Sequence, residues 1–156
     1  MGHKEIERKW LIDNPPDLSG AARIQIRQGY IAVSDQGPEV RLRRKGEKFF
    51  QSVKTGEGLQ RDEIEIELSE KQFRKLWPAT RGRRLDKVRH TLKRHGRKIE
   101  VDIYRQRLSG LKVAEVEFKT PRQAQSFSPP DWFGKEVTGD KAYKNANLAS
   151  RGEKEH

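Results

Sequence analysis

The chain has 156 residues, of which 32% are hydrophobic and 37% are charged, with a formal net charge of +11 and no cysteine. This length indicates one domain. The lack of cysteine excludes disulfides, thiolate metal sites and cysteine nucleophiles, and it fits a cytoplasmic location. No segment approaches the roughly 20 apolar residues of a membrane-spanning helix, so we expect no membrane association. The strong positive charge predicts an anionic partner: nucleic acid, anionic lipid or a phosphate compound.

Apolar and polar residues alternate with a period of two over much of the chain, which is typical of strands with one apolar face. Eight strands are predicted, over residues 3–11, 23–33, 38–45, 48–54, 62–68, 86–93, 98–105 and 112–119. Short turns separate most of them, and this favours antiparallel neighbours. Eight such strands can close into a barrel without exposed edges. The expected fold class is therefore α+β but mainly β: an eight-stranded antiparallel closed barrel with a few helices packed outside.

Three helices are predicted between and after these strands. Ser69 is a candidate N-cap for a helix over residues 70–76, which Pro78 ends. A second helix is expected from Pro121 to near Phe127, and a third over about 141–150. Residues 1–150 are therefore expected to form a single domain, followed by a charged tail over 151–156.

Charges of one sign repeat on single faces of the predicted strands, because residues i and i+2 of a strand point to the same side. The cationic and acidic repeats are Arg41-x-Arg43, Lys87-x-Arg89, Glu5-x-Glu7, Glu63-x-Glu65-x-Glu67, Glu100-x-Asp102 and Glu115-x-Glu117. One wet face of a sheet would explain any one repeat, but wet faces usually mix their charges because like neighbours repel. Together the repeats indicate a polar lumen that binds both an anion and cations.

A metal–polyphosphate satisfies both sets of charges. Carboxylate oxygens suit Mg²⁺ or Mn²⁺, and arginine and lysine suit phosphate. Phosphoryl transfer depends mostly on positioning and charge neutralisation, so such a lumen could hydrolyse a phosphoric anhydride. The apolar faces of the strands would then point outward, covered by the helices or by a partner chain, and a homodimer is one possibility.

The segment Glu5-Ile6-Glu7-Arg8-Lys9 is an ExExK signature, and it resembles the start of the CYTH family, also called the triphosphate tunnel metalloenzymes. The other charge repeats follow in the order typical of that family, with Lys54 standing before a glycine-rich turn. The stretches Arg27-Gln28-Gly29-Tyr30 and Tyr143-Lys144-Asn145 look like those of short bacterial members. The similarity covers about residues 3–149.

This resemblance implies an eight-stranded tunnel and a role for each charged group in it. The triphosphate would be held by Lys9, Arg41, Arg43, Lys54, Lys87 and Arg89. One metal ion, Mg²⁺ or Mn²⁺, would be held by Glu5, Glu7 and Glu117. A second metal ion or the attacking water would be served by Glu63, Glu65, Asp102 and Glu115, and Lys87 would also assist catalysis.

The resemblance also implies hydrolysis of a small-molecule triphosphate, with inorganic tripolyphosphate favoured because the chain looks most like the short bacterial branch. Class IV-type adenylyl cyclases, thiamine triphosphatases and nucleoside triphosphatases belong to the same family and stay open as alternatives, as does a catalytically silent polyphosphate binder. A basic nucleic-acid-binding module is a more distant alternative. Its best features are basic clusters at 81–84 and 93–98, and neither contains an aromatic residue that could stack on a base. We therefore expect no nucleic acid partner.

Overall fold

The structure is a computed structural model that describes residues 3–34, 37–56, 60–94 and 96–150. Its strands are β1 (His3–Leu11), β2 (Ala22–Ala32), β3 (Glu39–Lys45), β4 (Lys48–Thr55), β5 (Gln60–Leu68), β6 (Arg84–Arg94), β7 (Arg97–Tyr104) and β8 (Lys112–Phe118). Its α-helices are α1 (Glu70–Leu76), α2 (Pro121–Ser126) and α3 (Asn145–Ser150), with 3-10 turns η1 (Trp77–Thr80), η2 (Gln106–Leu108) and η3 (Lys141–Tyr143). All eight predicted strands and all three predicted helices are present, while the predicted tail over 151–156 lies outside the described residues.

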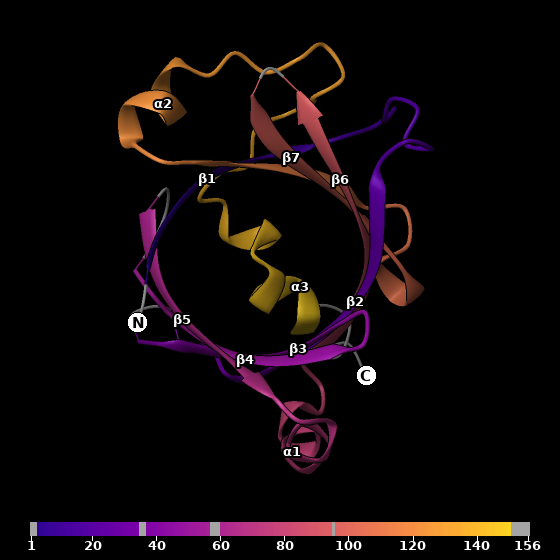
Figure 1. Cartoon of the computed structure of the whole chain (residues 1–156), viewed down its shortest axis with the longest axis vertical. Helices are drawn as coiled ribbons and strands as arrows, with labels where there is room; N and C mark the ends of the chain where they lie inside the picture. Colours follow the sequence, from indigo (N-terminus) through magenta and orange to yellow (C-terminus); the bar gives the residue numbers. More distant parts are fainter. Residues whose placement is uncertain (1–2, 35–36, 57–59, 95, 151–156) are drawn as a thin grey trace.

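The strands form one antiparallel sheet that curls around a central space (Figure 1). Their order is β1-β5-β4-β3-β2-β6-β7-β8, and β8 returns to β1. Among the described residues, β1 pairs with β5 from His3 to Ile6 and with β8 from Ile6 to Leu11. The eight antiparallel strands are confirmed. The expected closed barrel is shown in part: the strands curl around the lumen and β8 returns to β1, while the described pairing of β1 with β5 spans His3 to Ile6.

The hydrophobic core lies mainly on the outer side of this sheet. Trp10, Val116 and Phe118 are buried there in one cluster with Ala124 of α2 and Phe133 of the following segment. This arrangement inverts the usual small barrel, whose interior is filled with apolar side chains. It explains how a chain with 32% hydrophobic residues builds a core at all.

Helix α1 covers a second outer patch. Its N-terminus is a capping box, in which Ser69 Oγ accepts a hydrogen bond from Gln72 N at 3.1 Å and Gln72 Oε1 accepts one from Ser69 N at 2.8 Å. Phe73 then packs on Phe49 and Leu42 of the sheet. The capping signal in the sequence therefore predicted this helix correctly.

Helix α3 corrects the expectation that all helices pack outside. Ala146, Leu148 and Ala149 are buried against Tyr104 and Val113, which stand at lumen-facing positions of their strands. Figure 1 shows α3 within the outline of the strands, whereas α1 and α2 lie beyond it. The physical reason is the composition of Asn145–Ser150, which has no charged side chain and only small or apolar residues towards the strands. Helix α3 therefore closes one end of the lumen with apolar contacts.

Within the described residues, none of the helices has both the length and the apolar character needed to cross a membrane. The outer face of β5 carries Ile64 and Ile66, which are 52% and 53% exposed and lie under none of the helices.

Candidate active site

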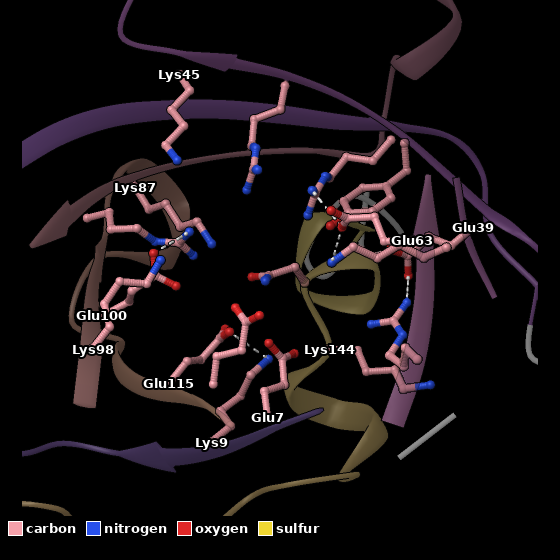
Figure 2. A pocket seen from close by; sticks show the side chains of 18 residues that line it. Glu7, Lys9, Glu39, Lys45, Glu63, Lys87, Lys98, Glu100, Glu115 and Lys144 are labelled. Carbon is pink, nitrogen blue, oxygen red and sulfur yellow. Dashed lines mark ion pairs between the residues drawn. The ribbon is translucent and has the colours of Figure 1, made fainter. Parts of the chain in front are cut away.

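Beyond α3, the lumen is a charged cavity of about 210 Å³. This volume is many times the roughly 10–15 Å³ that one water molecule needs. All eight strands contribute to its wall, and Figure 2 shows their side chains converging on the space from opposite sides. The lining residues are Glu7, Lys9, Tyr30, Glu39, Arg41, Arg43, Lys45, Lys54, Arg61, Glu63, Lys87, Arg89, Lys98, Glu100, Glu115, Glu117, Lys144 and Asn145.

Most of the residues that the sequence selected meet in this cavity. The six predicted triphosphate ligands all line it, and so do four of the predicted acidic residues: Glu7, Glu63, Glu115 and Glu117. Asp102 and Glu65 stand just behind the lining, each in contact with cations that belong to it. The backbone of Glu5 lies on β1, but its side chain is outside the described part of the structure.

The most enclosed group is a triad of Lys87, Arg89 and Asp102, which β6 and β7 hold side by side. Asp102 is 1% exposed, and it accepts hydrogen bonds from Arg89 Nε at 2.8 Å and Nη2 at 2.9 Å. Lys87 Nζ lies 2.7 Å from the second oxygen of the same carboxylate. The antiparallel register pairs Arg89 directly with Asp102, and alternation turns both side chains to the lumen, so register and alternation together place the bidentate contact. Asp102 thus fixes the directions of both cations.

A second group joins β1 to β8 and to the start of the C-terminal segment. Lys9 Nζ lies 3.7 Å from Glu115 Oε1 and donates a hydrogen bond to the carbonyl oxygen of Tyr143 at 3.0 Å. Glu7 and Glu117 face each other as direct cross-strand partners, and Glu115 faces Glu100 on β7. Like charges at such positions repel unless a cation lies near them.

A third group joins β3, β4 and β5. Lys54 Nζ lies 3.2 Å from Glu63 Oε2, and Arg41 Nη2 lies 3.8 Å from the same oxygen. Arg43 Nη2 lies 3.4 Å from Glu65 Oε2, which also accepts a hydrogen bond from Ser52 at 3.0 Å. Five of the predicted triphosphate ligands, in this group and the triad, are thus paired with carboxylates that the sequence assigned to metal or water.

Some polar atoms buried in this wall have no hydrogen-bond partner among the described residues. Arg43 Nε and Gln28 Oε1 are both buried, and neither has a hydrogen-bond partner in the part of the chain that the structure describes. Gln28 also donates to the Tyr30 hydroxyl at 2.8 Å. An unpaired buried group costs free energy. Because Arg43 lines the cavity, its Nε is a donor available to a bound anion.

The environment of the lumen shifts the pKa values of several of its charged side chains. Burial lowers the pKa of Lys87 to about 8, with Asp102 opposing this shift and Arg89 adding to it. Burial and the neighbouring Arg41 lower the pKa of Arg43 to about 10. For Glu115, burial would raise the pKa, but Lys9 and Arg89 outweigh it and hold the pKa at about 2. The cavity therefore keeps Glu115 ionised, and it makes Lys87 easier to deprotonate.

The acidic residues suit a hard divalent cation by their chemistry, because all their donors are carboxylate oxygens. Among the described residues, however, no three such groups stand close enough to hold a metal ion as they are arranged. The reason is visible in the contacts above: Glu63, Glu115 and Asp102 each turn towards a lysine or arginine. The donor set fits Mg²⁺ or Mn²⁺ once those pairs part.

Several lining residues were missing from the sequence prediction. Lys45, Arg61 and Lys98 stand one alternation step beyond Arg43, Glu63 and Glu100, so continuing the same count would have found them. Glu39 follows the same rule from Arg41, whereas Tyr30 lies on β2, opposite Arg41, and β2 carried no predicted site residue. Lys144 and Asn145 carry no such signal, because only the tertiary placement of α3 brings them to the cavity. The side chain of Tyr104 donates a hydrogen bond to Asn145, which fixes that placement.

Comparison with known proteins gives close relatives over nearly the whole chain. The inorganic triphosphatase of Nitrosomonas europaea is 46% identical over 146 residues, which cover 93% of this chain and 96% of that protein. The inorganic triphosphatase of Acetivibrio thermocellus is 35% identical over 147 residues, covering 93% and 92%. No protein-family model matches the sequence.

Solved structures agree with the architecture. The crystal structure of the inorganic triphosphatase NE1496 superposes with a TM-score of 0.71 at 43% identity, covering 94% of each chain. HpAC1 from Hippeastrum superposes with a TM-score of 0.59 at 14% identity, covering 78% of this chain and 82% of that one, which supports the fold alone. The fold, the ordered charge repeats in the cavity and the identity to these relatives lead to one assignment: the chain belongs to the CYTH family of triphosphate tunnel metalloenzymes, among the short bacterial inorganic triphosphatases.

Proposed function

We propose that this protein hydrolyses inorganic tripolyphosphate to pyrophosphate and orthophosphate in the charged lumen, with Mg²⁺ or Mn²⁺ as cofactor. The observation that carries the proposal is the lining, in which ten lysines and arginines meet six glutamates around one cavity. A linear triphosphate is the small ligand whose charge matches the cationic wall. The two relatives named above carry the same activity in their names.

Binding would proceed by exchange of partners. Lys9, Lys54, Lys87 and Arg89 now contact carboxylates, and a triphosphate entering the lumen would take over those contacts. The oxygens of the released carboxylates, with Glu7 and Glu117, would then be available to a divalent cation, which the ligand itself also attracts. When bound, such an ion neutralises phosphate oxygens and lowers the pKa of a coordinated water. Arg41 and Arg43 would keep the chain of phosphates in line.

Inorganic tripolyphosphate is preferred to an organic triphosphate because of what the cavity lacks. Among the described lining residues, Tyr30 is the single aromatic, and it is 1% exposed. Its hydroxyl is bound to Gln28, and its ring belongs to the apolar cluster around α3. A nucleobase or a thiamine ring would therefore find no aromatic surface to stack on. This argument disfavours the cyclase, thiamine triphosphatase and nucleoside triphosphatase alternatives.

The test is an assay of the purified protein with tripolyphosphate, ATP, thiamine triphosphate and pyrophosphate, each with Mg²⁺ or Mn²⁺. We expect metal-dependent phosphate release, fastest from tripolyphosphate. Cyclic AMP as the main product from ATP would instead establish the cyclase alternative. Absence of turnover with every substrate would leave a silent polyphosphate binder.

Glu7→Gln provides the matched test of the metal role, because it removes one charge and keeps the shape. We expect it to lower phosphate release by about a hundredfold or more, in line with the loss of a residue that supports a catalytic metal. Glu47→Gln, in the exposed turn between β3 and β4, is the control and should keep normal activity. If the protein bound RNA instead, Glu7→Gln should leave that binding unchanged.

Three further expectations stay as predictions. The lumen is proposed to act as a closed tunnel when ligand is bound, the protein to reside in the cytoplasm, and no nucleic acid to be required. A homodimer is also proposed, since Ile64 and Ile66 leave an apolar strip on β5. Light scattering on the eluting protein will determine its mass in solution.

A further inference from the structure

A groove on the outer face of the sheet is separate from the charged lumen. Its volume is about 320 Å³, and it crosses β3, β2 and β6 as far as the residue that follows β7. Alternation turns Ile26 and Lys87 to the lumen, so their backbones form the floor of the groove. The described helices α1 and α2 pack mainly on other strands, and Figure 1 shows no α-helix beyond β2. The lining residues are Gln25, Ile26, Arg27, Arg44, Gly46, Asp86, Lys87 and Arg105.

Four charged side chains cross this groove in one row. The register pairs Arg44 of β3 with Arg27 of β2, and Arg27 with Asp86 of β6. Arg105 comes next, because its backbone N–H donates a hydrogen bond to the carbonyl oxygen of Asp86 at 2.9 Å. Neighbouring strands lie about 4.8 Å apart, so the whole row spans about 14 Å. It contains three guanidinium groups and one carboxylate, which leaves a surplus of positive charge.

Two of these guanidinium groups are held in place through one nitrogen each. Arg27 Nε donates to Asp86 Oδ1 at 2.9 Å, and Arg44 Nε donates to the carbonyl oxygen of Gly46 at 3.0 Å. Arg44 Cζ also lies 5.6 Å from the centroid of the Phe49 ring. In the stretches of chain that the structure describes, the Nη groups of both arginines make no hydrogen bond. Two anchored donor groups therefore stand at directly opposed positions, where like charges repel unless an anion lies near them.

The surrounding charges strengthen the positive potential of the groove. Arg84 lies on the same outer face of β6, over the ring of Trp77, and its pKa is lowered first by burial and then by Arg81 and Arg27. Arg105 is exposed, and its side chain makes neither a hydrogen bond nor a salt bridge with any described residue. Guanidinium groups with available Nη donors suit the oxygens of a phosphate, which they can bind in pairs.

We propose that Arg27, Arg44 and Arg105 form a second anion site, outside the lumen, which binds a small inorganic phosphate such as pyrophosphate. Arg27 and Arg44 each direct their Nη donors at the phosphate oxygens, and Arg105 adds a third contact. The site goes beyond the proposed function, because its residues do not line the lumen. The groove lining contains no aromatic side chain on which a base could stack, which favours an inorganic ligand over a nucleotide.

The experiment counts binding sites by equilibrium dialysis with radiolabelled pyrophosphate in metal-free buffer. It compares the wild type with the groove variant Arg27→Gln/Arg44→Gln and the control variant Arg94→Gln/Arg122→Gln. The control removes the same charge at exposed positions outside both the groove and the lumen cavity. We expect the wild type and the control to bind one more equivalent than the groove variant, whatever the lumen itself binds. Affinity for that equivalent should fall by at least about tenfold, as the loss of two hydrogen bonds from charged donors predicts.

Equal binding by the wild type and the groove variant, or the same loss in the control, would refute the site. The count does not depend on hydrolysis, so the site and the triphosphatase function can fail separately. If the groove variant does not fold, Arg105→Gln replaces it, and an unchanged affinity of that variant would then refute the site. ADP carries the same diphosphate on a nucleoside, and tighter binding of ADP than of pyrophosphate in the groove would overturn the inorganic assignment.

Discussion

Asp102 is the carboxylate held most tightly in the lumen, because Lys87 and Arg89 both contact it from β6. Asp102→Asn would leave these two buried cations facing a neutral amide. We expect the free energy of unfolding to fall by about 3–5 kcal/mol, the range for breaking a buried pair by removing one partner. Urea denaturation will measure it. The exposed Asp131→Asn is the control, and an Asp102→Asn protein as stable as the wild type would contradict this account.

Lys87 gives a pH prediction for activity. Its pKa of about 8 lies below the ordinary lysine value, since burial disfavours the charged form. A triphosphate needs the ammonium, so kcat/KM for tripolyphosphate should fall as the pH rises through about 8. Lys87→Arg should remove this alkaline decline, because a guanidinium stays charged over the same range. A kcat/KM that rises above pH 8 would mean that the neutral amine is the active form.

Glu115 gives a prediction for stability in acid. Its pKa is lowered from 4.5 to about 2 in the folded protein, so the folded state binds fewer protons than the unfolded state between these values. Its contribution is therefore fully present above about pH 4.5 and is lost as the pH falls towards 2. It should amount to a few kcal/mol. Acid titration of Glu115→Gln, which lacks this proton equilibrium, should show a shallower decline than the wild type.

Most of the residues of the site could be predicted because strand alternation is a local property. Arg41 with Arg43, or Glu115 with Glu117, share a face whatever the rest of the fold does. What alternation cannot predict is which opposite charge each residue meets, because that depends on register between strands distant in sequence. The bidentate contact of Arg89 with Asp102 is such a case.

At the scale of elements, the contact between β2 and η1 depends on a glycine. A Cβ placed on Gly29 would lie 2.6 Å from Thr80 Cβ, which is closer than packed carbon atoms tolerate. Thr80 is buried and tied to Trp77 through its hydroxyl, so it cannot easily move. Gly29→Ala should destabilise the fold by about 1–3 kcal/mol, as overpacking does. Gly20→Ala, where the new Cβ meets nothing within 4 Å, should not; equal midpoints in urea for both variants would refute the clash.

Strands and helices were predicted well because their signals are short: period-two alternation, a capping serine and turn glycines. The position of α3 was not predictable in this way. A short helix without charged residues can pack on the outer face of a sheet or inside a lumen. In this protein α3 lies inside, because it packs on the lumen-facing side chains of Tyr104 and Val113. The pairing of β1 with both β5 and β8 was equally hidden, since it joins strands that are far apart in the sequence.

At the scale of the whole molecule, a net charge of +11 and a cationic cavity should attract polyanions from a distance. We expect kcat/KM for tripolyphosphate to fall severalfold between about 0.01 and 0.15 M salt, because screening shortens the Debye length from about 30 to about 8 Å. The measurement should use free metal concentrations held constant. A rate that does not depend on ionic strength would show that long-range attraction plays no part.

Because most of the apolar core lies outside the ring of strands, most of the side chains that line the cavity are separate from those that pack in the core. A change at a lumen position alters charge and hydration but removes little apolar packing, as the contrast between Lys45 and Trp10 illustrates. The same wall could therefore carry very different interiors. New anion specificities could be engineered into this chain by rewriting alternate residues of its strands while leaving the residues between them untouched.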